Sequence, residues 1–256
     1  ATLFIANIPP DARAEATFFD GDRLATGQAV VVPAGTPNAV AQVSCGVVAR
    51  SLRAVVVDAG TAEELHDGSV GEFWLHGDNV GRGYWRRPDD TRSTFQARLA
   101  ARLPTGSLAQ DVDPDANWLR TGDLGMFVDG QLYVTGRIVD LLSVSGRSFY
   151  PQEIEATVAE ASGLVRSGYV AVVGVPAGEG DEQLVIVAER ATGTSRSDPA
   201  SAIASIRAAV NRRHGVDPAD IRIVPAGAIP RTTSGKLARR ACRTRYLEGS
   251  LKGHQG

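Results

Sequence analysis

Asp123 and Arg137 are the residues of the first half of the chain whose types and surroundings suit a nucleotide. Asp123 follows Thr121 and Gly122 in a turn-forming sequence that we expect at the end of a strand, and Arg137 follows a glycine. An ionised carboxylate only accepts hydrogen bonds and can hold two neighbouring hydroxyls, such as those of a ribose. The fork of donors on an arginine suits a ribose or a phosphate. Each residue also has an ordinary explanation, as a turn aspartate bonded to its own backbone and as a surface arginine.

Lys236 is the candidate catalytic residue. It follows Gly235, which gives the backbone freedom to turn while the lysine projects a compact charge. When a carboxylate attacks the α-phosphate of ATP, negative charge builds on both partners, and an ammonium between them stabilises the transition state. The segment is not a P-loop, because Arg231 and Leu237 replace the glycine and the Ser or Thr of that motif. The alternative is a mobile surface lysine. With the carboxylate and the guanidinium, Lys236 indicates ATP-driven activation of a carboxylic acid.

Three other features each admit a functional and a structural interpretation. Gly146 and Arg147 precede a predicted helix, and the glycine permits either close approach of a ligand or a simple turn. The helix predicted at the C-terminal end is basic and would meet an acidic partner or face solvent; its arginines are Arg239, Arg240, Arg243 and Arg245. Cys45 has no neighbouring base, so we expect it to pack as a small hydrophobe.

The elements that must position these residues change in character along the chain. The first half reads as all-β, with short apolar runs at residues 29–32, 53–57, 72–76, 126–128 and 131–134. Asp129-Gly130 between the last two runs predicts a type I′ hairpin. One helix is predicted at residues 90–103, followed by a surface loop at 104–117.

The second half reads as α+β. Helices are predicted at residues 151–161, 200–213 and 237–247, and strands at 169–175, 183–188 and 221–224. Pro151 suits the first turn of a helix, and His214-Gly215 suits a helix end. The polar stretch at 191–198 is predicted to be a mobile connection.

Composition limits the classes of function. With 256 residues the chain has room for two domains, and a net charge of -2 gives no case for binding nucleic acid. Two cysteines and four histidines show no metal-ligand spacing, and two cysteines are too few for a disulfide scaffold, which fits a reduced, cytoplasmic compartment. No apolar run approaches the roughly 18 to 20 residues of a membrane span. Because the chain begins at Ala1, we expect a fragment or a processed product.

Several motifs together resemble the adenylate-forming superfamily, and within it the fatty acyl-AMP ligases. The likeness spans nearly the whole chain. It is carried by Ala1-Thr2-Leu3, Val43-Ser44-Cys45-Gly46, Trp118-Leu119-Arg120-Thr121-Gly122-Asp123-Leu124, Gly136-Arg137-Ile138-Val139-Asp140, Arg147-Ser148-Phe149-Tyr150-Pro151-Gln152-Glu153-Ile154-Glu155, Pro230-Arg231-Thr232-Thr233-Ser234-Gly235-Lys236 and Arg239-Arg240-Ala241-Cys242-Arg243.

The resemblance implies the C-terminal part of a longer enzyme, with an α+β fold. Residues 1–135 would end the large ATP- and acyl-binding domain, including a β-barrel-like subdomain, and residues 136–256 would form a small α/β lid with a short central sheet. By analogy Thr121, Asp123 and Arg137 contact the nucleotide and Lys236 catalyses adenylation. The fatty acid would pass as acyl-adenylate to the phosphopantetheine of an acyl carrier protein. The Mg²⁺ ligand of the ATP site would lie before Ala1, so the piece alone would be inactive.

The resemblance also implies a hinge at Val139 and Asp140, and a loop at Gly146 and Arg147 that faces the second half-reaction after the lid turns. Val139 departs from the family, whose members commonly have Asp or Lys there. Three alternatives stay open: an acyl-CoA synthetase, a peptide-synthetase adenylation domain, and a non-catalytic module that docks a carrier protein through its basic helix.

Overall fold

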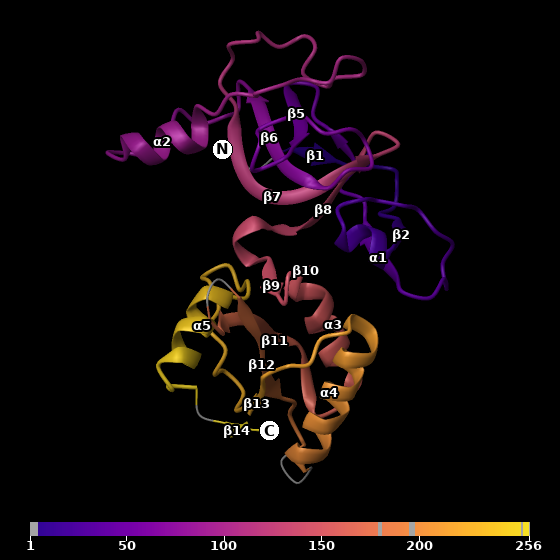
Figure 1. Ribbon diagram of the computed structural model, residues 1–256, viewed down its shortest axis with the longest axis vertical. Coiled ribbons are helices and arrows are strands. Elements are labelled where there is room, and N and C mark those ends of the chain that lie inside the picture. Colours follow the sequence, from indigo (N-terminus) through magenta and orange to yellow (C-terminus); the bar gives the residue numbers. More distant parts are fainter. Residues whose placement is uncertain (1–4, 179–180, 195–197, 252, 256) are drawn as a thin grey trace. The chain divides into compact units, whose positions relative to one another are not determined.

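The structure is a computed structural model that describes residues 5–178, 181–194, 198–251 and 253–255. The chain divides into two compact units, Ala1–Val139 and Asp140–Gly256 (Figure 1). The boundary predicted from the sequence lies between residues 135 and 136, whereas strand β8 runs on through Arg137 before the units divide. The Ala1-Thr2-Leu3 motif lies outside the described residues, as do positions 195–197 of the predicted polar connection.

The first unit is built on an antiparallel sheet of four strands. Its order is β5 (Leu52–Val57), β6 (Gly71–Gly77), β7 (Leu119–Val128) and β8 (Gln131–Arg137). Successive side chains of a strand point to opposite faces, so β5 and β6 contribute side chains to two hydrophobic cores, one on each face of the sheet. Ala54, Val56 and Phe73 pack on one face, and Val55 and Trp74 pack on the other. Because both faces are covered, these strands read as continuous apolar runs.

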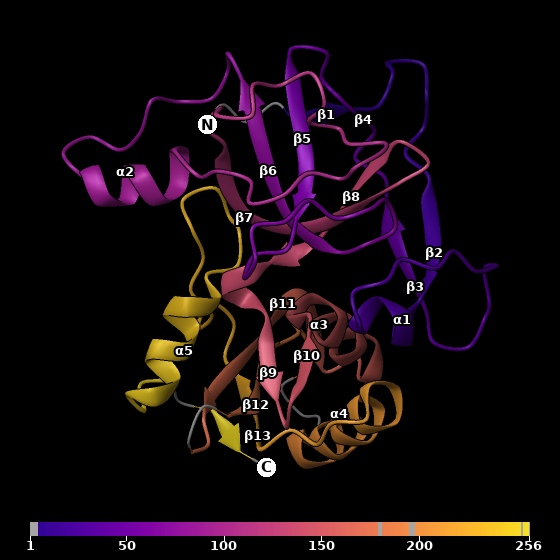
Figure 2. The same ribbon diagram turned by 45° about the horizontal axis from the view of Figure 1, so that its top comes forward.

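Shorter pieces flank this sheet. β1 (Ala6–Asn7) pairs with β4 (Val47–Val48), and β2 (Ala16–Asp20) pairs with β3 (Ala39–Val43), with helix α1 (Gly21–Ala25) directly after β2. β2 and β3 lie toward the β8 side of the sheet (Figure 2). β5 and β8 do not pair with each other, so the described strands form several open sheets and no closed barrel. The expectation of a barrel-like subdomain is corrected in this respect.

Turn chemistry sets the β7–β8 hairpin. Asp129 and Gly130 have φ angles of 51° and 72°, as a type I′ turn requires, and the hairpin prediction is confirmed. The predicted strand at 29–32 is wrong, because among these residues only Val31 makes a β-bridge, to Phe19.

The helix predicted at 90–103 is wrong in extent. Helix α2 covers Pro88–Phe95 and then stops, because Ala97 exchanges backbone hydrogen bonds with Trp118 instead of continuing the helical pattern. The following stretch at 104–117 is not wholly a surface loop. Ala109 and Val112 are buried against the Trp74 face of the sheet.

The second unit is a mixed sheet covered on both faces. Its order is β11 (Val165–Pro176), β12 (Glu182–Arg190), β13 (Asp220–Val224) and β14 (His254–Gln255), and β12 and β13 are parallel. Helices α3 (Pro151–Ala161) and α4 (Pro199–His214) cover one face, and α5 (Arg239–Leu247) covers the other (Figure 1). The helices and strands predicted for this half are confirmed within a few residues at each end.

Local signals set the ends of these helices. Pro151 begins α3 where its missing N–H has no helical partner, and Gly215 ends α4 in the left-handed conformation, as predicted. The hairpin of β9 (Leu142–Val144) and β10 (Arg147–Phe149) was not predicted from the sequence. The 3₁₀ turn η1 (Ile138–Asp140) joins the units. None of the described helices has the length and apolar character that crossing a bilayer would demand.

Candidate functional site

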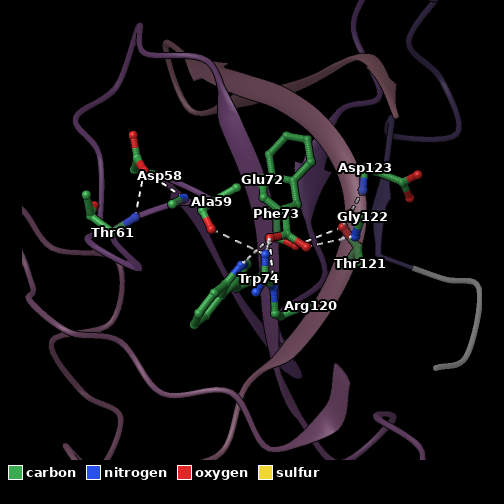
Figure 3. Close-up of polar contacts among 11 residues, drawn as sticks. Asp58, Ala59, Thr61, Glu72, Phe73, Trp74, Arg120, Thr121, Gly122 and Asp123 are labelled. Carbon is green, nitrogen blue, oxygen red and sulfur yellow. Dashed lines mark hydrogen bonds and ion pairs between the residues drawn. The ribbon is translucent and has the colours of Figure 1, made fainter. Parts of the chain in front are cut away.

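Thr121, Gly122 and Asp123 lie inside strand β7 rather than at its end, which corrects the sequence prediction. Gly122 has a φ of 71°, and the register of β7 shifts on its β6 side near this point and again on its β8 side after Leu124. Such irregularities bend a strand without ending it and re-aim its side chains. The strand therefore continues while its backbone turns Asp123 outward (Figure 3).

Glu72 of β6 is the buried anchor of this bend. Its side chain is 2% exposed, and Oε1 accepts a hydrogen bond from the N–H of Gly122 at 3.0 Å. Oε2 accepts from the indole of Trp74 at 2.9 Å and from two nitrogens of Arg120 at 3.0 and 2.7 Å. A buried carboxylate is tolerated only when it is paired and hydrogen-bonded. Glu72 meets both conditions, so it fixes the backbone next to Asp123 (Figure 3).

Arg120 holds this carboxylate from the next strand. Its guanidinium lies 5.3 Å from the centre of the Trp74 ring and reaches the carbonyl of Ala59 at 3.5 Å. The N–H groups of Thr61 and Gly60 in that turn donate to Asp58 and hold its pKa below the ordinary value. The anchor is thus connected to the β5–β6 side of the sheet as well as to β7.

Thr121 and Arg137 fix the Asp123 side chain from both sides. The Thr121 hydroxyl donates to the carbonyl of Phe73 at 2.8 Å and accepts from the N–H of Asp123 at 3.0 Å. Asp123 faces Arg137 across the β7–β8 register, and Arg137 Nε donates to Asp123 Oδ1 at 2.7 Å. Asp123 Oδ2 accepts no hydrogen bond within the described part of the chain, and the side chain is 31% exposed. One carboxylate oxygen is therefore held in place while the other is available to a ligand's hydroxyls.

Lys236 lies in the second unit, in the loop that leads into α5. The Thr232 hydroxyl accepts from the N–H of Lys236 at 3.0 Å, and the Lys236 carbonyl accepts from the N–H of Thr232 at 2.8 Å. Gly235 makes the turn with a φ of 80°. The Lys236 side chain is exposed and forms no ion pair with any residue that the structure describes. The backbone of the lysine is ordered by the loop while its ammonium stays available.

A stack of charged and aromatic side chains holds the first end of this loop. Arg231 donates to the carbonyl of Gly235 at 2.6 Å and to the carbonyl of Gly168, and its guanidinium lies 3.8 Å from the centre of the Tyr169 ring. Arg166 lies over the same ring at 3.4 Å and pairs with the fully buried Glu189 at 3.2 Å. The lysine loop is thereby fixed to strands β11 and β12.

The predicted hinge residues lie together in η1. Val139 is 55% exposed, and Asp140 is largely buried beneath Arg239 of α5. Gly146, with a φ of 73°, makes the β9–β10 turn after Ser145, which also has a positive φ. Arg147 donates to the carbonyls of His214 and Gly215 at the end of α4, at 3.2 and 3.3 Å.

The four arginines of α5 differ in their partners. Arg239 pairs with Asp140 and Glu155, Arg243 donates to the carbonyl of Gly174, and Arg245 donates to that of Ala228. Only Arg240 of this set forms no side-chain hydrogen bond or ion pair with a described residue. Of the four, only Arg239 pairs with carboxylates among the described residues, so the other three keep their net positive charge and the carrier-docking alternative stays a prediction.

No cluster of three or more candidate metal ligands occurs in the ranges that the structure describes. Cys45 is exposed rather than packed, which corrects our expectation for that residue.

The sequence reading missed Glu72, Arg120 and Arg231 as parts of the site. A glutamate inside an otherwise apolar strand, and an arginine beside the Thr-Gly-Asp sequence, were the available signals. Their pairing depends on the register between β6 and β7, which the sequence does not display.

The chain is similar to known ligases over nearly its whole length. No family model matches the chain. It is 46% identical, over 98% of its length, to the long-chain-fatty-acid AMP ligase FadD32 of Mycolicibacterium smegmatis, and 37% identical, over 97%, to the long-chain-fatty-acid AMP ligase FadD28 of Mycobacterium tuberculosis. The chain is homologous over nearly its whole length to proteins named as fatty acyl-AMP ligases. It spans only 43% and 41% of the lengths of these two relatives.

Solved structures place this fatty acyl-AMP ligase homologue among adenylate-forming enzymes. A chain from a study of fatty acyl-adenylate ligases of E. coli and L. pneumophila matches with a TM-score of 0.73 and 27% identity, over 93% of this chain and 38% of that chain. ATP-bound MatB from Rhodopseudomonas palustris matches with a TM-score of 0.62 and 28% identity, over 79% and 35% of the two chains. The mixed α/β architecture is therefore that of the adenylate-forming fold.

Proposed function

We propose that this chain is the C-terminal portion of a cytoplasmic, ATP-dependent fatty acyl-AMP ligase. The longer enzyme activates a fatty acid as an acyl-adenylate and passes the acyl group to the phosphopantetheine of an acyl carrier protein. In this proposal Ala1–Val139 ends the large domain, and Asp140–Gly256 is the mobile lid. The chain by itself would be inactive, since it spans less than half the length of its relatives.

The proposal is supported chiefly by the fixed Asp123–Arg137 pair, in which Asp123 Oδ2 accepts no hydrogen bond from a described residue. That oxygen accepts hydrogen bonds from the ribose hydroxyls, while Arg137 adds donors for the ribose or the adjoining phosphate. Thr121, itself predicted to contact the nucleotide, also orients Asp123, because its hydroxyl accepts from the N–H of Asp123. Glu72 keeps the whole bend rigid, which lowers the entropy lost on binding.

Lys236 supplies the charge for the chemical step. The fatty acid carboxylate attacks the α-phosphorus of ATP, a P–O bond to pyrophosphate breaks, and the ammonium bridges the oxygens on which charge grows. When bound, Mg²⁺ would neutralise charge on the phosphates. The Gly146–Arg147 turn would face the acceptor in the second half-reaction, after rotation at Val139.

The test uses the complete polypeptide in which this chain lies, supplied with fatty acid and ATP, and measures acyl-adenylate in single turnovers. Lys236→Ala should lower the adenylation rate about 10³-fold, a loss of about 4 kcal/mol of transition-state stabilisation, with ATP affinity changed less than about threefold. Arg240→Ala, four residues further along in the first turn of α5, is the control and should match wild type. A Lys236→Ala enzyme with wild-type adenylation would refute the role of the lysine.

An acyl-CoA synthetase is the second candidate, because one relative at 38% identity is named a putative fatty-acid CoA ligase, FadD21 of Mycobacterium tuberculosis. Offering coenzyme A and a carrier protein in parallel separates the two. Thioester on the carrier protein supports the first proposal, and thioester on coenzyme A alone supports the second.

A further inference from the structure

Arg239 joins two parts of the second unit that lie at opposite ends of its sequence. Its Nη1 donates to Asp140 at 3.1 Å, and its Nε and Nη2 form a two-pronged pair with Glu155 at 2.7 Å each. The three side chains are between 13% and 21% exposed. Charge-assisted and bidentate bonds of this kind, largely shielded from water, impose a definite geometry.

Arg239 is also the first residue of α5, directly after the lysine loop. That loop is fixed at its other end by Arg231, whose guanidinium holds the carbonyls of Gly235 and Gly168 and stacks on Tyr169. Lys236 therefore lies between two anchored arginines. Arg239, the second of these arginines, donates to Asp140, which is the last residue of η1.

On the premise of the function proposed above, we infer that Arg239 is a positioning residue that locks the pivot of the lid to the lysine loop. Asp140 is held as part of the second unit, so rotation is confined to the backbone at Val139. Lys236 then travels with the turning unit as a rigid piece, and one orientation of the pivot corresponds to one position of the ammonium. Neither Arg239 nor Asp140 needs to touch the substrate for this effect.

Asp140→Asn is the sharpest perturbation. It removes the charged acceptor at the pivot and leaves the two bonds between Arg239 and Glu155 that hold α5 to α3. Asp217→Asn is the matched control, since Asp217 forms a single ion pair with Arg207 at 2.9 Å in the same unit but far along the chain from η1.

The experiment combines kinetics and hydrogen exchange on the complete polypeptide. In Asp140→Asn we expect kcat for adenylation to fall about 10-fold with KM for ATP unchanged, because misplaced catalytic groups cost rate and not ground-state binding. We also expect faster amide exchange both at residues 138–142 and in the lysine loop at 232–238. The Asp217 control should show neither change.

The inference is overturned if Asp140→Asn behaves like the control in kinetics, or if exchange rises at 138–142 but not in the lysine loop. If kcat falls together with the melting temperature of the second unit, and exchange is faster throughout that unit, the effect is ordinary destabilisation and the inference is also overturned. If the wild-type polypeptide forms no acyl-adenylate, the proposed function fails. The exchange comparison still decides whether the pivot and the loop are coupled.

Discussion

Replacement of Glu72 by glutamine tests whether the buried carboxylate holds the bend of β7 beside Asp123. The amide keeps one acceptor oxygen but turns a hydrogen-bond donor toward either Arg120 or the N–H of Gly122. About two bonds to a charged group are lost, at about 1.5–3 kcal/mol each. Arg120 is 36% exposed and recovers part of its hydration, which favours the lower end. We expect the free energy of unfolding of the first unit to fall by about 3 kcal/mol.

Tryptophan fluorescence measures this loss selectively. The three tryptophans are Trp74, Trp85 and Trp118, and all of them lie in the first unit. A loss of about 3 kcal/mol corresponds to a fall of about 10 °C in the midpoint of the fluorescence transition for a unit of this size. Glu63→Gln is the control, because Glu63 is exposed on the same β5–β6 connection and should shift the midpoint by less than about 2 °C. A Glu72→Gln protein that melts with the control would refute the anchoring role.

Two further substitutions test the electrostatics of the second unit and the packing of the first. Burial raises the pKa of Glu153 from 4.5 to about 7, so the fold favours the protonated acid, and this stability is present below pH 4.5 and lost as pH rises through 7. Glu153→Gln should therefore raise the free energy of unfolding of the second unit at pH 8 by about 2–3 kcal/mol, with little change at pH 4.5, as measured by calorimetry; no gain at pH 8 would contradict this. Gly125→Ala should destabilise the first unit by about 3 kcal/mol in urea unfolding, because its Cβ would overlap the carbonyl of Tyr133 and the ring of Phe73. Gly130→Ala meets no neighbour and should cost only about 1 kcal/mol through its positive φ, so equal losses at the two glycines would be evidence against the steric argument.

Elements governed by local chemistry were predictable from the sequence. α3 begins at Pro151 as expected, α4 ends at Gly215, and Asp129-Gly130 makes the β7–β8 turn. In each case the deciding interaction is made by residues next to one another along the chain. Residue type and spacing therefore carry the necessary information.

Features that depend on distant partners were not predictable. α2 stops early because Ala97 pairs with Trp118. The β9–β10 hairpin is local and was missed for another reason, since Ser145 adopts a positive φ that serine rarely takes. The site shows the same limit. Asp123 and Lys236 were singled out by their motifs and their roles stay predictions, whereas Glu72 is defined by a partner 48 positions away in sequence.

The two-sided core of the second unit has a practical consequence for protein engineering. Helices from the unit's own sequence cover both faces of its sheet, so the segment holds within itself the apolar contacts that a separately expressed module needs. Because Asp140 pairs with Arg239, a domain transplant between related ligases should be cut before Asp140. A cut placed after it would remove one of the two carboxylates that pair with Arg239 and leave that arginine with Glu155 alone.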